Sequence, residues 1–132
     1  MVNRWTYSNT TVFNIGYHLI WCSKYSKNVL VDDVEKRLRG ILSEKADEID
    51  VDIEHLEIMP DNIHLFVKTP PTASPHWVVQ QLKGYSSSVL REEFPHLKSR
   101  LPTLWTRSYY CESVGHISEE AVKKYTEEQK NQ

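Results

Sequence analysis

The sequence is short of three things: paired cysteines, long apolar runs and an excess of charge of either sign. Cys22 and Cys111 are its two cysteines, they lie far apart, and they form no CxxC pair. Two lone cysteines without a secretion signal indicate a reducing compartment and argue against a zinc cluster. No apolar run approaches the roughly 18–20 residues that span a membrane, and residues 1–14 lack an apolar signal-peptide core. We therefore expect a cytoplasmic protein with no membrane partner.

The formal net charge is only −2, which by itself does not indicate a nucleic-acid-binding protein. The charge is unevenly spread, however. Residues 32–61 contain eleven acidic and four basic side chains, whereas residues 1–31 and 62–118 each have a net charge of +3. If the acidic segment lies on one side of the fold, a modest basic face remains elsewhere. An ordinary solvated surface would give the same pattern, so charge alone leaves both interpretations open.

The chain has 132 residues, 39% hydrophobic and 26% charged, which suits a single domain, residues 1–132, with a sizeable core. The spacing of apolar and turn residues predicts the order strand, helix, strand, strand, helix, strand, helix. The expected ranges are 12–25, 32–49, 51–59, 62–69, 75–94, 108–114 and a last helix capped by Ser118. The first six elements follow the ferredoxin-like split β-α-β pattern, so we expect an α+β fold with an antiparallel sheet and a C-terminal helix.

Local signals support several of these boundaries. Asp32 or Asp33 is expected to cap the first helix, and Ser74 followed by Pro75 is expected to begin the second. The "PD" turn at 60–61 joins its two flanking strands as a hairpin.

The stretch "PDNIHLFV" at 60–67 contains one histidine in an otherwise apolar strand. On a strand, Asn62 and His64 point to the same face, so two side chains that can bind a metal lie side by side. One interpretation is a structural histidine that has found a partner. The other is half of a metal site in which asparagine occupies the position of a second histidine.

The last predicted helix contains "YTEEQ", which places Tyr125 and Gln129 four residues apart on one helix face. Tyrosine can form covalent phosphoryl intermediates, but its pKa near 10 makes it a poor nucleophile unless a metal or a base is nearby. His64 and Gln129 are candidate ligands for such a metal, and imidazole with carbonyl oxygen suits manganese or magnesium better than zinc. Taken separately, each of these residues is more often structural.

Five segments together resemble a known family. They are "YHLIWCSKY" (17–25), "EIMPDNIHLFV" (57–67), "LKGYSSSVLREEFPHL" (82–97), "LWTRSYYCESVG" (104–115) and "KKYTEEQ" (123–129). In this order and spacing, over nearly the whole chain, they resemble the TnpA-type transposases of insertion sequences that move as single strands. These enzymes belong to the His-hydrophobic-His (HUH) single-tyrosine endonucleases. The resemblance implies a ferredoxin-like fold, a homodimer, and cleavage and rejoining of single-stranded DNA with subterminal hairpins at element ends.

The resemblance also implies residue roles. Tyr125 would be the catalytic nucleophile that forms a 5′-phosphotyrosine bond, and His64 and Gln129 would bind a divalent metal, Mg²⁺ or Mn²⁺. Asn62 falls where the family has its first histidine. Because an amide oxygen donates less well than an imidazole, we expect weak metal binding and slow cleavage, which Asn62→His would improve. The alternative is that a carboxylate, Asp61 or Glu57, has taken over as ligand.

Nucleic-acid contacts are expected within residues 83–109, which begin inside the second predicted helix. The candidate phosphate-binding residues, with Gly84 allowing close approach, are Lys83, Ser86, Ser87 and Arg91. Trp105 and Tyr109, together with Arg107, are candidates for stacking on bases or binding the backbone. Tyr17 and Trp77 are expected to pack in the core instead.

The sequence is compared with three candidate functions. The first is an active single-strand transposase, and the second is a DNA-binding protein of the same fold that has lost or nearly lost nicking through Asn62. A ferredoxin-like RNA-binding module is disfavoured, because the strands lack the aromatic pattern of such modules and Tyr125 and Gln129 would have no role. For the homodimer we expect the sheets to join through an edge strand, an expectation motivated by the resemblance and by the apolar run at 12–21.

Overall fold

The structure is a computed structural model, and it describes residues 6–7 and 12–114. Its elements in chain order are β1 (Thr6–Tyr7), β2 (Val12–Phe13), β3 (Gly16–Cys22), the 3-10 helix η1 (Lys24–Ser26), α1 (Asp32–Glu48), β4 (Asp52–Met59), β5 (Asn62–Lys68), α2 (Pro75–Glu93), α3 (Pro95–Arg100) and β6 (Tyr110–Ser113). The predicted last helix, with Ser118, Tyr125 and Gln129, lies outside the described residues.

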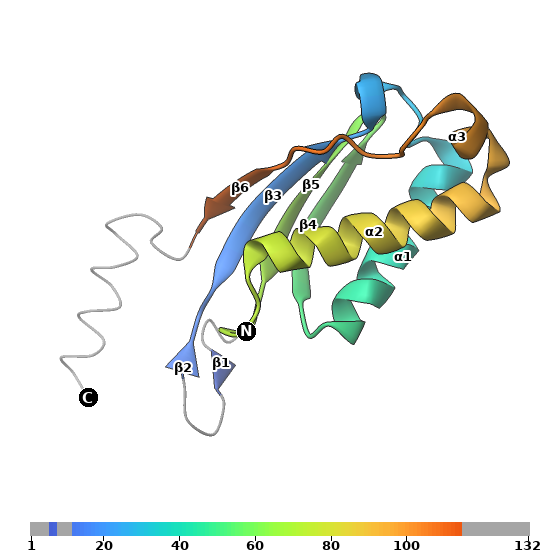
Figure 1. Ribbon diagram of the computed structural model, residues 1–132. Coiled ribbons are helices and arrows are strands. Elements are labelled where there is room, and N and C mark those ends of the chain that lie inside the picture. Colours follow the sequence, from blue (N-terminus) through green and yellow to red (C-terminus); the bar gives the residue numbers. More distant parts are fainter. Residues whose placement is uncertain (1–5, 8–11, 115–132) are drawn as a thin grey trace.

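A four-stranded antiparallel sheet in the order β4-β5-β3-β6 forms the centre of the molecule. The helices α1 and α2 both lie against the same side of this sheet, and no described helix covers the other side (Figure 1). β1 and β2 pair as a separate two-stranded sheet. The strand order and the connections confirm the predicted ferredoxin-like α+β fold.

Alternation along β5 shows how the sequence produces two different sheet faces. Ile63, Leu65 and Val67 are fully buried, whereas Asn62 and His64, which alternate with them, are only half-buried. Successive strand residues point to opposite faces, so the apolar set faces the helices and the polar set faces away from them. We call the helix-covered side the core face and the other side the open face.

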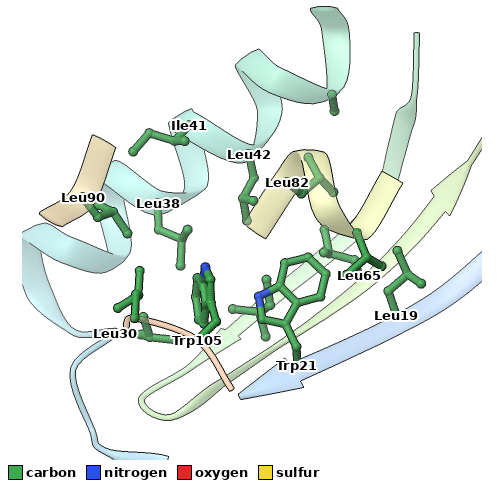
Figure 2. Close-up of a cluster of buried hydrophobic side chains, with 14 of the residues drawn as sticks. Leu19, Trp21, Leu30, Leu38, Ile41, Leu42, Leu65, Leu82, Leu90 and Trp105 are labelled. Carbon is green, nitrogen blue, oxygen red and sulfur yellow. The ribbon is translucent and has the colours of Figure 1, made fainter. Parts of the chain in front are cut away.

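The core lies between the core face and the two long helices (Figure 2). β3 contributes Leu19 and Trp21, whose indole makes an edge contact with the ring of Trp105 at 6.0 Å between centroids. The fully buried residues of the helices recur at helical spacing and include Leu38, Ile41, Leu42, Val78, Leu82 and Leu90. An apolar helix stripe packed on alternating strand residues is the arrangement that buries both patterns at once.

Most boundaries were predicted within a few residues, and the start of α2 was predicted correctly. The Ser74 hydroxyl accepts a hydrogen bond from the Trp77 amide at 3.1 Å, and Pro75 is the first helical residue. The start of α1 differs from the prediction: its N-cap is Val31, and no side chain caps it. Asp32 and Asp33 lie instead in the first turn, where the helix dipole favours acidic side chains.

Two further expectations need correction, and one helix was not predicted. The strand expected over 12–25 is divided into β2 and β3, and the helix α3 was not predicted. Tyr17 packs against the core as expected, but Trp77 is 41% exposed. Trp77 lies in the first turn of α2, at the rim of a hollow of about 680 Å³ that Pro70, Thr72 and Ala73 also line.

The apolar run at 12–21 does not provide an edge strand. Most of it forms β3, which pairs with β5 on one side and with β6 on the other. Its apolar character therefore reflects an interior position, and the edges of the four-stranded sheet are β4 and β6. Within the described residues, no helix is both long and apolar enough to cross a membrane.

Candidate active site and nucleic-acid surface

The open face brings His64 and Asn62 together as predicted. Both lie on β5 two residues apart, next to the turn that joins β5 to β4. The Asn62 side-chain amide donates a hydrogen bond from Nδ2 to the Asp61 carboxylate at 2.7 Å. Its carbonyl oxygen, Oδ1, is buried and has no hydrogen-bond partner among residues 6–7 and 12–114. A buried acceptor without a partner is costly, and an oxygen of this kind is a ligand that Mg²⁺ and Mn²⁺ accept. The residues present therefore fit a hard divalent cation.

Side chains from both neighbouring strands surround His64 on the open face. Glu57 of β4 lies directly opposite it, and Ile20 of β3 lies opposite it on the other side. The imidazole of His18, two residues along β3, has its ring centroid 5.9 Å from that of His64. His18 was missed as a member of this site, although its alternation with Leu19 and Trp21 already placed it on the opposite side from the core.

A complete metal site is not visible in residues 6–7 and 12–114. No group of three or more histidine, cysteine, aspartate or glutamate side chains in this part of the chain is arranged to hold a metal. His64 and Asn62 supply one imidazole and one amide oxygen. The predicted third ligand, Gln129, and the predicted nucleophile, Tyr125, lie outside the described residues.

Tyr110 is the tyrosine on the open face, and it is a poor candidate for the nucleophile. It lies in register with Ile20, is 51% exposed, and its ring makes an edge contact with that of His18. Its hydroxyl donates a hydrogen bond to the Glu112 carboxylate at 3.1 Å, and this bond together with the nearby negative charge raises the pKa of Tyr110. A raised pKa reduces the phenolate fraction, so Tyr110 is less nucleophilic than an ordinary tyrosine.

Arg107 lies where a nucleic acid can reach it. The residue is exposed and lines a hollow of about 430 Å³ between α2 and the segment before β6, together with His76, Lys83 and Tyr109. The imidazole Nδ1 of His76 and the hydroxyl of Tyr109 are 2.8 Å apart. Two aromatic rings held together beside two cationic side chains form a surface that can accept both a base and a phosphate.

Lys83 has a structural role in addition to lining this hollow. Its ammonium donates hydrogen bonds to the backbone carbonyls of Thr106, at 2.6 Å, and Ser108, at 3.4 Å. Partial burial lowers the pKa of Lys83. The side chain therefore ties the segment before β6 to α2, and one of the three ammonium donors remains for a phosphate.

Ser86 is not available to DNA, so its predicted phosphate contact is wrong. The residue is 0% exposed. Its hydroxyl donates to the Leu82 carbonyl at 2.6 Å and accepts a hydrogen bond from the Trp105 indole at 3.0 Å. Trp105 is likewise buried, so it cannot stack on a base. Both side chains are parts of the core, and Ser86 satisfies the indole N–H inside it.

Ser87 and Arg91 line a second hollow of about 570 Å³ on α2, together with Gly84, Ser88 and Lys98. Arg91 is partly engaged, because one terminal nitrogen donates to the Leu101 carbonyl at 3.1 Å. The described structure thus divides the predicted contacts between two hollows, one at Arg107 and Lys83 and one at Ser87 and Arg91.

Comparison with known proteins agrees with this fold. The sequence profile of the family described as "Transposase IS200 like" matches residues 11–129. The ISDra2 transposase TnpA of Deinococcus radiodurans is 37% identical over 121 residues, which cover 89% of this chain and 86% of the relative. The transposase for insertion sequence element IS200 of Salmonella typhimurium is 31% identical over 107 residues, which cover 80% of this chain and 70% of the relative.

Solved structures give the same result. A Deinococcus radiodurans chain assigned as a transposase superposes in its crystal structure with a TM-score of 0.78 at 34% identity, covering 96% of this chain and 97% of that chain. A REP-associated tyrosine transposase bound to a REP hairpin has a TM-score of 0.60 at 9% identity, covering 91% of this chain and 67% of that one, and so shows the fold alone. The fold is that of these transposases. The chain belongs to the IS200-like transposase family.

Proposed function

We propose that this chain cleaves and rejoins single-stranded DNA at the ends of an insertion sequence through a covalent bond to Tyr125. The observation that supports this most directly is the pair His64 and Asn62 on the open face of the sheet, where the Asn62 carbonyl oxygen has no partner among the described residues. A transposase needs side chains that activate the phosphate. Within the described part of the chain, we assign His64 and Asn62 to this role.

In the proposed reaction the phenol oxygen of Tyr125 attacks the scissile phosphorus. The bond between phosphorus and the 3′ oxygen breaks, and the phenol proton ends on that leaving oxygen, which becomes the free 3′-hydroxyl. His64, Asn62 Oδ1 and Gln129 would hold a magnesium or manganese ion, which polarises the phosphate when bound. The phosphotyrosine bond retains the energy of the broken bond, so a later 3′-hydroxyl can reverse the step without another energy source.

We propose that the DNA partner is a single strand with a subterminal hairpin. A protein of the same fold is bound to a REP hairpin, and we extend that kind of partner to this chain as part of the proposal. On this chain, Arg107 and Lys83 would contact phosphates while the paired rings of His76 and Tyr109 accept an unpaired base. Ser87 and Arg91 on α2 offer a second contact to the backbone.

We infer that the working form is a homodimer in the reducing cytoplasm. Both cysteines of the chain, Cys22 and Cys111, have free thiols, which suits that compartment. The sheet edges that a second copy can extend are β4 and β6. Light scattering at micromolar concentration should give about twice the chain mass of 15.5 kDa, and a monomer across all dilutions would remove the dimer from the proposal.

The test of the proposed function is covalent capture. The wild-type chain is incubated with manganese and an end-labelled single strand that contains an element end, and the products are separated on a denaturing gel. Tyr125→Phe should abolish the labelled adduct and leave DNA affinity within a few-fold, because only the hydroxyl is lost. Tyr110→Phe is the matched control and should retain the adduct. DNA binding by the wild type without any adduct would instead favour the DNA-binding protein that has lost nicking.

A further inference from the structure

A bulge in β4 turns Glu57 toward His64. The pairing of β4 with β5 runs from Ile53 opposite Val67 to His55 opposite Phe66, so Glu54 is an extra residue with no partner. Before the bulge Ile53 packs on the core, and after it Leu56 and Ile58 do so. An unbroken strand would have placed residue 57 on the core face with residue 53.

The bulge therefore has a definite consequence for the site. It shifts the sidedness of β4 by one residue and puts the Glu57 carboxylate on the open face, directly opposite His64. Directly opposed residues in an antiparallel pair have Cβ atoms about 4.5–5.5 Å apart, which is close enough for their side chains to share a cation. Bulges are common next to active sites, where they redirect a side chain.

Asp61, the other carboxylate near this position, is already engaged. One of its oxygens accepts the hydrogen bond from Asn62 Nδ2 at 2.7 Å. This bond holds the amide so that its donor end faces Asp61, and its acceptor end, Oδ1, has no partner in the described part of the chain. Glu57 is exposed. Among residues 6–7 and 12–114, its side-chain carboxylate has neither a hydrogen-bond nor an ion-pair partner.

We propose that Glu57 is a ligand of the divalent metal, together with His64 and Asn62 Oδ1, and that it replaces the donor strength lost where asparagine stands in place of histidine. This inference rests on the metal site of the proposed function. Carboxylate oxygen is the ligand that Mg²⁺ and Mn²⁺ favour most, and its negative charge offsets the weak donation of a neutral amide. On this account the site binds manganese well as the chain stands, and Asn62→His changes the affinity little.

The experiment measures manganese binding by the full chain without DNA. Free Mn²⁺ is followed by its electron paramagnetic resonance signal during titration of the wild type, Glu57→Gln, Glu54→Gln and Asn62→His. Glu57→Gln should weaken the affinity at least about 10-fold, the scale on which changes around a metal act. Glu54→Gln removes the same charge from the same strand at the bulge and should leave the affinity unchanged.

A double variant sharpens the test. If Glu57 takes the place of the missing histidine, Glu57→Gln combined with Asn62→His should regain most of the affinity that Glu57→Gln alone loses. Equal affinity of the wild type and Glu57→Gln would overturn the proposal, as would an equal loss in Glu54→Gln, which would indicate charge rather than ligation.

The capture assay separates this result from the proposed function. An adduct formed by the wild type, with manganese affinity unchanged in Glu57→Gln, overturns the role of Glu57 and leaves the transposase reaction standing. Manganese binding that depends on Glu57, with no adduct under any condition, supports the ligand and overturns the reaction.

Discussion

The two faces of one sheet are built from the same strands and have opposite characters. On β5, Leu65 faces the helices and is fully buried, while its neighbour His64 faces away from them with Glu57 and Ile20 beside it. The core face determines the stability of the fold, since it is closed by α1 and α2. The open face contains the polar side chains that can do chemistry and has little effect on stability. Substitutions of adjacent residues on β5 should therefore have different effects, on stability at Leu65 and on DNA cleavage at His64.

The largest effect should come from breaking the core face. Leu65→Ala removes a fully buried side chain and should lower the free energy of unfolding by about 2–5 kcal/mol. His64→Ala, one residue away, should lower it by less than about 1 kcal/mol, because its side chain faces the open side. Urea denaturation followed by circular dichroism measures both, and equal losses would contradict the division into two faces.

A smaller loss is expected at the polar group inside the core. Ser86→Ala leaves the buried Trp105 indole N–H without its acceptor, which should cost about 1–3 kcal/mol in the same denaturation assay. Ser88→Ala, on the exposed side of the same helix, is the control and should stay within about 0.5 kcal/mol of the wild type. DNA affinity should be unchanged in Ser86→Ala. If Ser86→Ala weakened DNA binding and not stability, Ser86 would belong to the DNA surface and not to the core.

Substitutions on the proposed DNA surface should change DNA binding without changing stability. Arg107→Ala removes an exposed cation and should weaken binding of a hairpin-bearing single strand several-fold and reduce the slope of affinity against salt by about 1. Arg100→Ala, an exposed arginine on α3 that lines a different hollow, should change neither quantity. Fluorescence anisotropy over a series of salt concentrations gives both. A salt slope that Arg107→Ala leaves unchanged would place the DNA elsewhere.

The smallest effect concerns the outer surface of the helices. Arg37 on α1 binds both carboxylate oxygens of Glu93 on α2, at 2.8 and 3.0 Å. The hydrogen bond from Arg37 lowers the pKa of Glu93. A carboxylate with a lowered pKa stabilises the fold above its ordinary pKa, and this contribution disappears as the pH falls through the lowered value. The melting temperature of Arg37→Ala should thus lie slightly below that of the wild type at neutral pH, and the two values should converge in acid.

The core face could be predicted from the sequence because its signal is local. The alternation of Ile63, Leu65 and Val67 and the helical spacing of α1 and α2 gave the elements and their order. The same alternation placed Asn62 beside His64 correctly. Tyr125 and Gln129 remain predictions, because they lie outside the described residues.

What could not be predicted depends on register between distant segments. The apolar residues of "VDIEHLEIM" change sides between Ile53 and Leu56, which signals a break, but the position of Glu57 opposite His64 follows only from the pairing of β4 with β5. The position of His18 near His64 likewise follows only from the pairing of β3 with β5. Ser86 was misassigned because nothing in its own helix shows that Trp105, nineteen residues later, folds back onto it.

If the open face activates DNA cleavage, the reaction should depend on His64. The measurement is the yield of covalent protein–DNA adduct with manganese and a labelled single-stranded element end, compared between the wild type and His64→Ala at equal DNA occupancy. We expect an adduct with the wild type and none above background with His64→Ala, although the variant stays folded and binds DNA. An adduct that forms at the wild-type rate without His64 would show that the open face does not activate cleavage.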